Sequence, residues 1–507
     1  MGLGAWFLVR TWSLVRPGSL VLIALVLLIG SAVHASSEAD AQLIAATKQG
    51  RRAEARTLIS GRHANVNARE ADGTTALHWA VRADDHETAQ LLIRAGADAS
   101  ASNRYGVTPL SLAAVNGSAA MIEALLEAGA DPNTSAPAGE TVLMTAARTG
   151  KVAAVRSLIA RGADVNAREG SFGETALMWA AAENHADVSR LLVDRGADVN
   201  ARSNLVDLPN VKVDFATMVV TALSRGGLTP LMFAARQGAG DAAAALAGAG
   251  ANLNLTDPDG MSALVIAIIN AHYDVASVLL DKGADPNVAD VAGMAALYAA
   301  VDMHTLDPMI NRPAPRPTGD VSAVDIVGRL LAHGANVNAR LKAPLLARQH
   351  NSGDPNLGEG ASPLMRAARS GDIVLMQVLL EGGADVKLAT KSGMTPLLFA
   401  TGTSRRKSDK AAIEAITLCL DRGADINESN ANGETALHIA AAQADSVVSF
   451  LAERGAKLDV KDRQGRTPLD VALGVGGVAG RGAGGRGAPP AVRESTVALL
   501  RQLIARQ

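Results

Sequence analysis

Aromatic residues, cysteine and an excess of charge of one sign are scarce in this sequence, and each scarcity narrows the possibilities. Aromatic residues make up 3% of the chain and all hydrophobic residues 48%, so the core must consist mainly of Ala, Leu and Val, which suits thin, closely packed helices. The single cysteine, Cys419, allows no internal disulfide, so the fold must be stable by packing alone. Its apolar surroundings in "AITLCLDRGAD" predict a buried, inert thiol. The formal net charge of −2 gives no electrostatic reason to expect a nucleic-acid partner.

The first 35 residues have the pattern of an export signal. Arg10 and Arg16 precede an unbroken apolar run at 20–29, and the small residue Ala35 ends the segment. Because that run is too short to span a bilayer comfortably, we expect a signal peptide at 1–35 and cleavage before Ser36. The mature chain would then be an exported bacterial protein, periplasmic or secreted, with no membrane contact. The stretch before the run is long, so an uncleaved membrane anchor is the alternative.

One short phrase recurs along the rest of the chain. It reads "DGTTALHWAVRADD" at 72, "AGETVLMTAARTGK" at 138 and "NGETALHIAAAQAD" at 432. Eleven glycines begin such units, and in every unit Leu stands four residues later and Ala seven residues later. These glycines are Gly73, Gly106, Gly139, Gly173, Gly227, Gly260, Gly293, Gly360, Gly393, Gly433 and Gly465. A fixed register of this kind indicates the structural unit from which the chain is built, not a catalytic signature.

Each shared position of the unit has a physical role. The first Gly suits a turn with positive φ, which other residues resist. The Thr or Ser two residues later is a helix N-cap, and the Pro that often follows is suited to the first helical position. The Leu and the Ala then face one side of a short helix. In most units a second Gly, 23 residues after the first, closes a second helix before "GADVNA" or a variant of it. One unit is therefore helix, tight turn, helix and extended finger.

Phrases such as "TALHWA" and "GADVNA" on a 33-residue period resemble ankyrin repeats, and the resemblance covers nearly all of residues 38–507. It implies an all-α fold, a solenoid of stacked helix-turn-helix units with extended β-hairpin fingers, and we expect a monomer. Residues 36–71, which lack the Gly-x-Thr start, are expected to form an N-terminal capping repeat. Residues 72–466 are then the ankyrin repeats, and 467–507 a C-terminal capping repeat with a Gly-rich loop at 474–490.

Departures from the period place insertions near 203–226, 304–321, 341–359 and 403–410. The first insertion is too apolar for a solvated loop. It is expected either to fold back on neighbouring fingers or to cap a binding groove or meet a partner.

The sequence predicts no catalytic residue, no metal site and no cofactor. Gly482, Gly484 and Gly487 match G-x-G-x-x-G, but no strand precedes them and no helix follows, so a linker is favoured over a dinucleotide site. His78 and His438 come directly after the helix-start Leu and are expected to be structural, and no His pair has metal-ligand spacing. The alternative from another class is an accessory enzyme or redox-protective factor of the periplasm, with a surface site near the finger insertions.

The candidate binding residues follow from the repeat frame, in which we count places from the capping Thr, Ser or Ala. Places +4 and +7 lie one helical turn apart and away from the core side. Place +4 holds Trp79, Trp179, Phe233 and Phe399, and place +7 holds Arg82, Arg148, Arg236 and Arg369. Tyr105 and Phe172 occur at finger tips. Trp and Arg dominate interface hot spots, although +4 is ordinarily an apolar place, half buried between adjacent repeats.

The resemblance implies that the +4 and +7 places and the finger tips line the groove through which ankyrin proteins bind other proteins. We therefore expect a non-catalytic protein–protein interaction scaffold of the bacterial cell envelope. A membrane-anchored envelope component is a further alternative.

Overall fold

The computed structural model describes residues 38–206, 225–305, 316–344, 357–402, 407–475 and 492–506. The predicted signal peptide at 1–35 lies outside these ranges, as do large parts of the four insertions and most of the Gly-rich loop. The chain divides into two compact units. Unit 1 consists of Met1–Ala180 with Leu191–Ala197, and unit 2 of Ala181–Arg190 with Asp198–Gln507.

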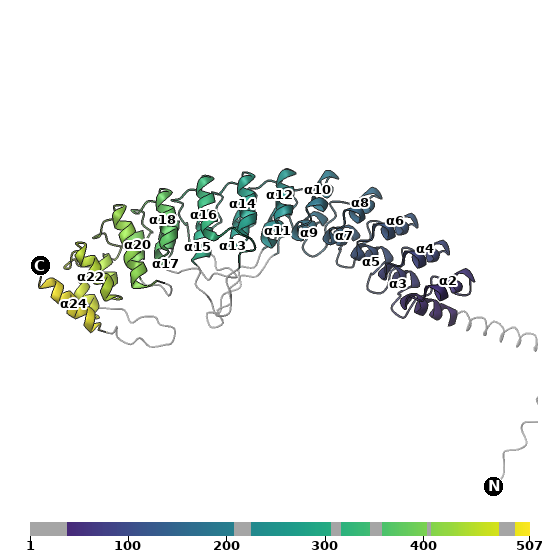
Figure 1. Cartoon of the computed structure of the whole chain (residues 1–507), viewed down its shortest axis with the longest axis horizontal. Coiled ribbons are helices and arrows are strands. Elements are labelled where there is room, and N and C mark those ends of the chain that lie inside the picture. Colours follow the sequence, from purple (N-terminus) through teal and green to yellow (C-terminus); the bar gives the residue numbers. More distant parts are fainter. Residues whose placement is uncertain are drawn as a thin grey trace, which may run out of the picture. The chain divides into compact units, whose positions relative to one another are not determined.

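Unit 1 is built from paired helices in two rows (Figure 1). The inner row has α3 packed on α5 and α5 on α7, and the outer row has α2, α4, α6 and α8 packed in order. A helix over residues 38–48 comes first. The others are α2 (Arg52–Ser60), α3 (Ala76–Arg82), α4 (His86–Arg94), α5 (Pro109–Asn116), α6 (Ala119–Glu127), α7 (Val142–Thr149) and α8 (Val152–Ala160). The division between the units runs through α9 (Ala176–Ala182) and α10 (Ala186–Asp194).

Unit 2 repeats the same arrangement (Figure 1). Its inner row comprises α11 (Pro230–Gln237), α13 (Ala263–Ile269), α15 (Ala296–His304), α17 (Pro363–Ser370), α19 (Pro396–Thr401), α21 (Ala436–Ala441) and α23 (Pro468–Ala472). Its outer row comprises α12 (Gly240–Gly248), α14 (Tyr273–Asp281), α16 (Ala323–Ala332), α18 (Ile373–Glu381), α20 (Asp409–Asp421), α22 (Asp445–Glu453) and α24 (Glu494–Ile504). Consecutive helices within each row pack against one another.

The predicted N-cap of the inner helices is confirmed. Thr108 has an extended backbone before α5, its side chain accepts the backbone N–H of Ser111, and Pro109 occupies the first turn. This bond satisfies one of the N–H groups that a helix start otherwise leaves unpaired. Ala295, which replaces Thr in one unit, makes no side-chain cap bond because it has no hydroxyl.

The Gly that begins each repeat is required for two reasons, which Gly139 shows together. Its φ is 86°, in the left-handed region that favours Gly. A Cβ at this position would lie 2.7 Å from the backbone N of Gly170 in the next finger. A side chain here would therefore strain the turn and push neighbouring fingers apart.

The core follows the predicted pattern of Leu and Ala. Leu77 and Ala80 of α3 are fully buried, as their counterparts in the other repeats generally are. Cys419 is also fully buried, and burial raises the pKa of its thiol to about 12. The thiol therefore stays protonated and unreactive at neutral pH, as the sequence predicted.

The fingers are hairpins held by isolated antiparallel bridges, and the described residues contain no longer strand. The bridges are Arg69–Thr75, Ser135–Thr141, Leu205–Gly226, Thr256–Ser262 and Ser429–Thr435. At the base of the first insertion the Val206 N–H also donates to the carbonyl of Arg225, at 2.8 Å. The two residues that flank the inserted chain are thus hydrogen-bonded to each other within one finger.

Neighbouring repeats are also joined through the Asn of "GADVNA". The Asn133 side chain donates to the carbonyl of Gly162 at 3.1 Å and accepts the backbone N–H of Asp164 at 2.8 Å. The same two-way bond to the following repeat is made by Asn67, Asn287 and Asn338. One amide therefore satisfies a helix-end carbonyl and a loop N–H of the next repeat.

Candidate functional site

The +4 ring of α3 lies under two cations. Trp79 is half-buried, with the Lys48 Nζ 4.2 Å and the Arg82 guanidinium 5.5 Å from its ring centroid. Glu70, in the adjoining finger, accepts the indole N–H at 2.8 Å and pairs with Lys48 at 3.2 Å. The sequence predicted that Arg82 lies one helical turn from Trp79. It did not reveal Lys48 or Glu70, because both come from the preceding capping repeat.

The +4 ring of α9 also lies beneath a cation, but in the described ranges it lacks the second cation and the carboxylate found at Trp79. Trp179 is half-buried, and the Arg148 guanidinium of α7 lies 5.1 Å from its ring centroid. Arg148 thus reaches the ring of the next repeat, as Lys48 reaches Trp79. The Trp179 Nε1 is buried and has no hydrogen-bond partner among the described residues. Nine residues before Trp179 stands Gly170, where Glu70 stands nine residues before Trp79.

The two Phe rings at +4 in unit 2 lie in the core. Phe233 is 5% exposed and Phe399 is 1% exposed. The Arg236 guanidinium lies 4.8 Å from the Phe233 ring centroid. Because both rings are almost fully buried, the structure supports the packing interpretation for them, and Phe399 also lines the pocket described below.

In α17 the +4 place holds a charged residue. Arg366 is buried, and its Nε donates to Asp302 Oδ1 at 2.7 Å. Asp302 is itself buried and occupies the +7 place of α15. Arg366 also donates to the carbonyl of Thr305 at 3.0 Å. The place that holds a ring in α3, α9, α11 and α19 is thus occupied in α17 by one member of an ion pair across two repeats.

The tip aromatics of unit 1 are the large apolar side chains that its fingers present to solvent. Tyr105 is 59% exposed and Phe172 is 55% exposed. The Arg104 guanidinium lies 4.9 Å from the Tyr105 ring centroid and donates to its hydroxyl at 2.7 Å. The sequence prediction that these two residues lie at finger tips is therefore correct in position, and both rings are available for contact.

A buried carboxylate fixes the tip that carries Phe172. Glu169 accepts the backbone N–H of Ser171 at 2.7 Å and that of Glu174 at 3.2 Å, and it also accepts the N–H of Phe172. Burial alone would raise the pKa of Glu169, but these backbone hydrogen bonds outweigh burial and lower it. The ionised carboxylate thereby holds the turn in one conformation, so Phe172 is presented on a rigid support.

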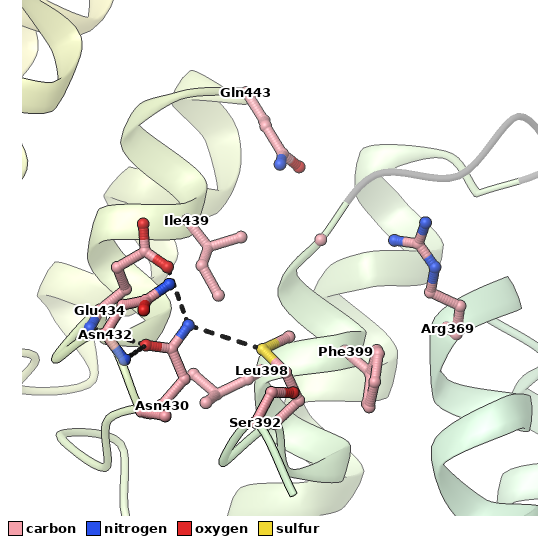
Figure 2. A pocket seen from close by; sticks show the side chains of 12 residues that line it. Arg369, Ser392, Leu398, Phe399, Asn430, Asn432, Glu434, Ile439 and Gln443 are labelled. Atoms are coloured by element: carbon pink, nitrogen blue, oxygen red, sulfur yellow. Dashed lines mark hydrogen bonds between the residues drawn. The ribbon is translucent and has the colours of Figure 1, made fainter. Parts of the chain in front are cut away.

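A pocket of about 430 Å³ lies between the inner helices and fingers of two repeats in unit 2 (Figure 2). Its lining comprises Arg369, Ser392, Met394, Leu398, Phe399, Gly402, Asn430, Ala431, Asn432, Glu434, Ile439 and Gln443. Arg369 is the last of the predicted +7 cations and forms part of the rim. The structure therefore places it beside the buried Phe399, in a hollow that the sequence did not predict.

The histidines that follow the helix-start Leu are structural. The His78 Nδ1 accepts the backbone N–H of Thr75 at 3.2 Å, and its Nε2 lies 3.0 Å from the carbonyl of Val107 in the next repeat. Burial lowers the pKa of His78, so the ring is neutral at neutral pH. His438 makes the same contacts, to Thr435 and to the carbonyl of Arg466.

Metal-ligand clusters and membrane-spanning helices are both absent from the described residues. Within the part of the chain that the structure covers, no group of three or more His, Cys, Asp or Glu side chains is arranged to hold a metal ion. No helix in those same ranges has the length and apolar character needed to cross a membrane.

Comparison with known proteins gives similarity to several repeat-containing chains. The chain is 34% identical over 114 residues to a transient receptor potential cation channel subfamily A member 1 homolog of Caenorhabditis elegans, covering 22% of this chain and 9% of that protein. It is 38% identical over 100 residues to neurogenic locus notch homolog protein 1 of Xenopus laevis, covering 18% and 4%. It is 27% identical over 166 residues to the phosphocholine transferase AnkX of Legionella pneumophila, covering 32% and 16%. The chain thus spans less than a fifth of the length of these relatives.

The family comparison covers most of the chain. A model described as ankyrin repeats (3 copies) matches residues 43–136, 131–203, 213–305 and 407–478, and a model of the single ankyrin repeat matches 359–388. These matches take in both units and follow the helix pairs and fingers described above. The chain belongs to the ankyrin-repeat family.

Proposed function

We propose that this chain is a non-catalytic scaffold that binds a partner protein through one face of unit 1. This face, which we name the groove face, consists of the +4 and +7 side chains of the inner helices together with the finger tips. Ankyrin repeats are in general associated with protein–protein interaction, which supports the class of function. The similarity to AnkX covers 16% of that protein, so transferase activity is not part of the proposal.

The observation that carries the proposal is the exposure of Tyr105 and Phe172, at 59% and 55%, on finger tips that lie two repeats apart. Rings held out on rigid turns bury a large area on binding at a low cost in side-chain entropy. Trp79 and Trp179 lie half-buried in the inner helices of the same unit, each beneath a cation. Partly exposed Trp with adjacent Arg is the composition of interface hot spots.

We also propose that the protein acts in the bacterial cell envelope, supported by the charged and apolar pattern of residues 1–35. Mass spectrometry of the protein purified from its native source checks this. A mature chain beginning at Ser36 is the expected result, and a chain retaining residues 1–35 would instead indicate an anchored envelope component.

The test of the binding face uses affinity capture with crosslinking from the native envelope, followed by titration of the purified partner. The double substitution Tyr105→Ala with Phe172→Ala should weaken binding at least about tenfold, which corresponds to roughly 1.4 kcal/mol. Val374→Ala is the matched control, because Val374 is 54% exposed on the outer helix α18. A partner that binds the double variant as tightly as the unaltered protein would refute the assignment of this face.

A further inference from the structure

The pocket between α19 and α21 lies beside an inner helix whose +7 residue is Gly and therefore has no side chain. In unit 1 the Arg148 side chain, at the +7 place of α7, lies beside Trp179, the +4 ring of the following repeat. In α19 the +7 place is Gly402, which has no side chain to reach the next repeat. Small tip residues, Ser392 and Ala431, leave the adjoining finger side open as well. Three small residues, Gly402, Ser392 and Ala431, thus line the hollow.

The floor and the rim of this pocket differ in chemistry. The apolar lining consists of the half-buried Ile439 with Leu398 and Phe399, which are 0% and 1% exposed, while Arg369 and Glu434 stand on opposite sides (Figure 2). Glu434 is held in place by the Asn430 side chain at 2.8 Å and by Arg466 at 3.6 Å. One side of the pocket is therefore positively charged and the opposite side is negatively charged, with uncharged residues between them.

The amide groups at the rim suit a polypeptide backbone. Asn432 and Gln443 both line the opening, and side-chain amides both donate and accept hydrogen bonds. The Asn432 backbone N–H donates to Asn430 Oδ1 at 2.9 Å, which fixes the finger that carries Asn432. A volume of about 430 Å³ is within the range of about 300–1,000 Å³ typical of ligand pockets.

We propose that this pocket is a specificity subsite that takes one large uncharged apolar side chain from an extended segment of a partner protein. The segment carries an acidic residue on the Arg369 side and a basic residue on the Glu434 side. Charge complementarity fixes this order, because the reversed segment would bring like charges together at both edges. The inference rests on the proposed function, since it assigns the kind of partner that the scaffold binds, but it places the contact in unit 2.

Gly402 offers a substitution that fills the pocket without disturbing the backbone. Its φ of −65° and ψ of 150° are an extended conformation open to every residue. A Cβ there would meet Arg369 Nη1 at 3.5 Å as its nearest neighbour, which is ordinary van der Waals contact. Gly402→Leu therefore blocks the hollow. Gly248→Leu is the matched control, because a Cβ at Gly248 on the outer helix α12 would meet no atom within 4 Å.

The experiment selects random dodecapeptides displayed on phage against the full chain and measures the selected peptides by fluorescence anisotropy. We expect a family of peptides with acidic, apolar and basic residues in that order. Their affinity should fall at least about tenfold in Gly402→Leu and stay unchanged in Gly248→Leu. Synthetic versions with the acidic and basic ends exchanged should bind more weakly, and Arg369→Glu should remove that preference.

Failure of the subsite and failure of the binding face give different results. If no selected peptide depends on Gly402, the subsite is refuted, whereas peptides that depend on Tyr105 and Phe172 would still support the groove face of unit 1. If neither Gly402→Leu nor the double substitution at Tyr105 and Phe172 affects any peptide or partner, both proposals are refuted.

Discussion

The same place in the repeat has different surroundings in the two units. In unit 1 the +4 place of α3 and α9 holds Trp, half-buried beneath a cation from the preceding repeat. In unit 2 it holds Phe in α11 and α19, with rings that are 5% and 1% exposed, and Arg366 of a buried ion pair in α17. Trp is larger than Phe and carries a polar N–H, so part of its ring extends beyond the interface between the two repeats. The +4 place therefore lies between two repeats in both units, and the size of the side chain at this place determines whether part of it is exposed to solvent.

The largest expected effect comes from breaking the buried pair that stands where unit 1 has a ring. Arg366→Leu leaves Asp302 in the core without the guanidinium that neutralises it. Removal of one member of a buried pair costs about 3–5 kcal/mol. We expect a clear fall in the urea midpoint of the transition followed by circular dichroism.

A double substitution that replaces the whole ion pair by apolar side chains should restore this stability. Arg366→Phe combined with Asp302→Ala imitates the packing at Phe233 and should recover most of the lost stability, because replacement of a whole buried pair by apolar residues is often neutral. An unaltered midpoint in Arg366→Leu would show that the pair contributes no stability to unit 2.

A smaller effect is expected when the two Trp residues of unit 1 are each replaced by Phe in separate variants. Trp79→Phe removes the hydrogen bond to Glu70, and bonds to charged groups are worth about 1.5–3 kcal/mol. Trp179→Phe removes a buried N–H that has no partner among the described residues, so stability should change by less than about 0.5 kcal/mol. Thermal unfolding of the two variants side by side measures the difference, and equal losses would mean that the indole N–H groups are equivalent.

The fold and its core could be predicted from the sequence because they depend on local spacing. The Thr108 cap, the turn at Gly139 and the buried Leu77 each follow from residues within one repeat. The surroundings of the rings could not be predicted, because they depend on contacts between repeats. Glu70 meets Lys48 from 22 positions away in the sequence. The hollow at Gly402 depends on three small residues that come together only when the fingers stack.

The smallest expected effect concerns the tip that presents Phe172 and tests whether its rigidity depends on one carboxylate. Hydrogen bonds lower the folded-state pKa of Glu169 despite its burial, so its stabilising contribution is present above its unfolded pKa of about 4.3. That contribution is lost as the pH falls through this value toward the folded pKa. Amide hydrogen exchange at Ser171 and Glu174 should therefore speed up in this acidic window more than the intrinsic rate accounts for. Glu169→Gln, which cannot ionise, should exchange faster at neutral pH and lose the additional acid dependence. Equal protection in both proteins at neutral pH would show that the turn holds its shape without the carboxylate.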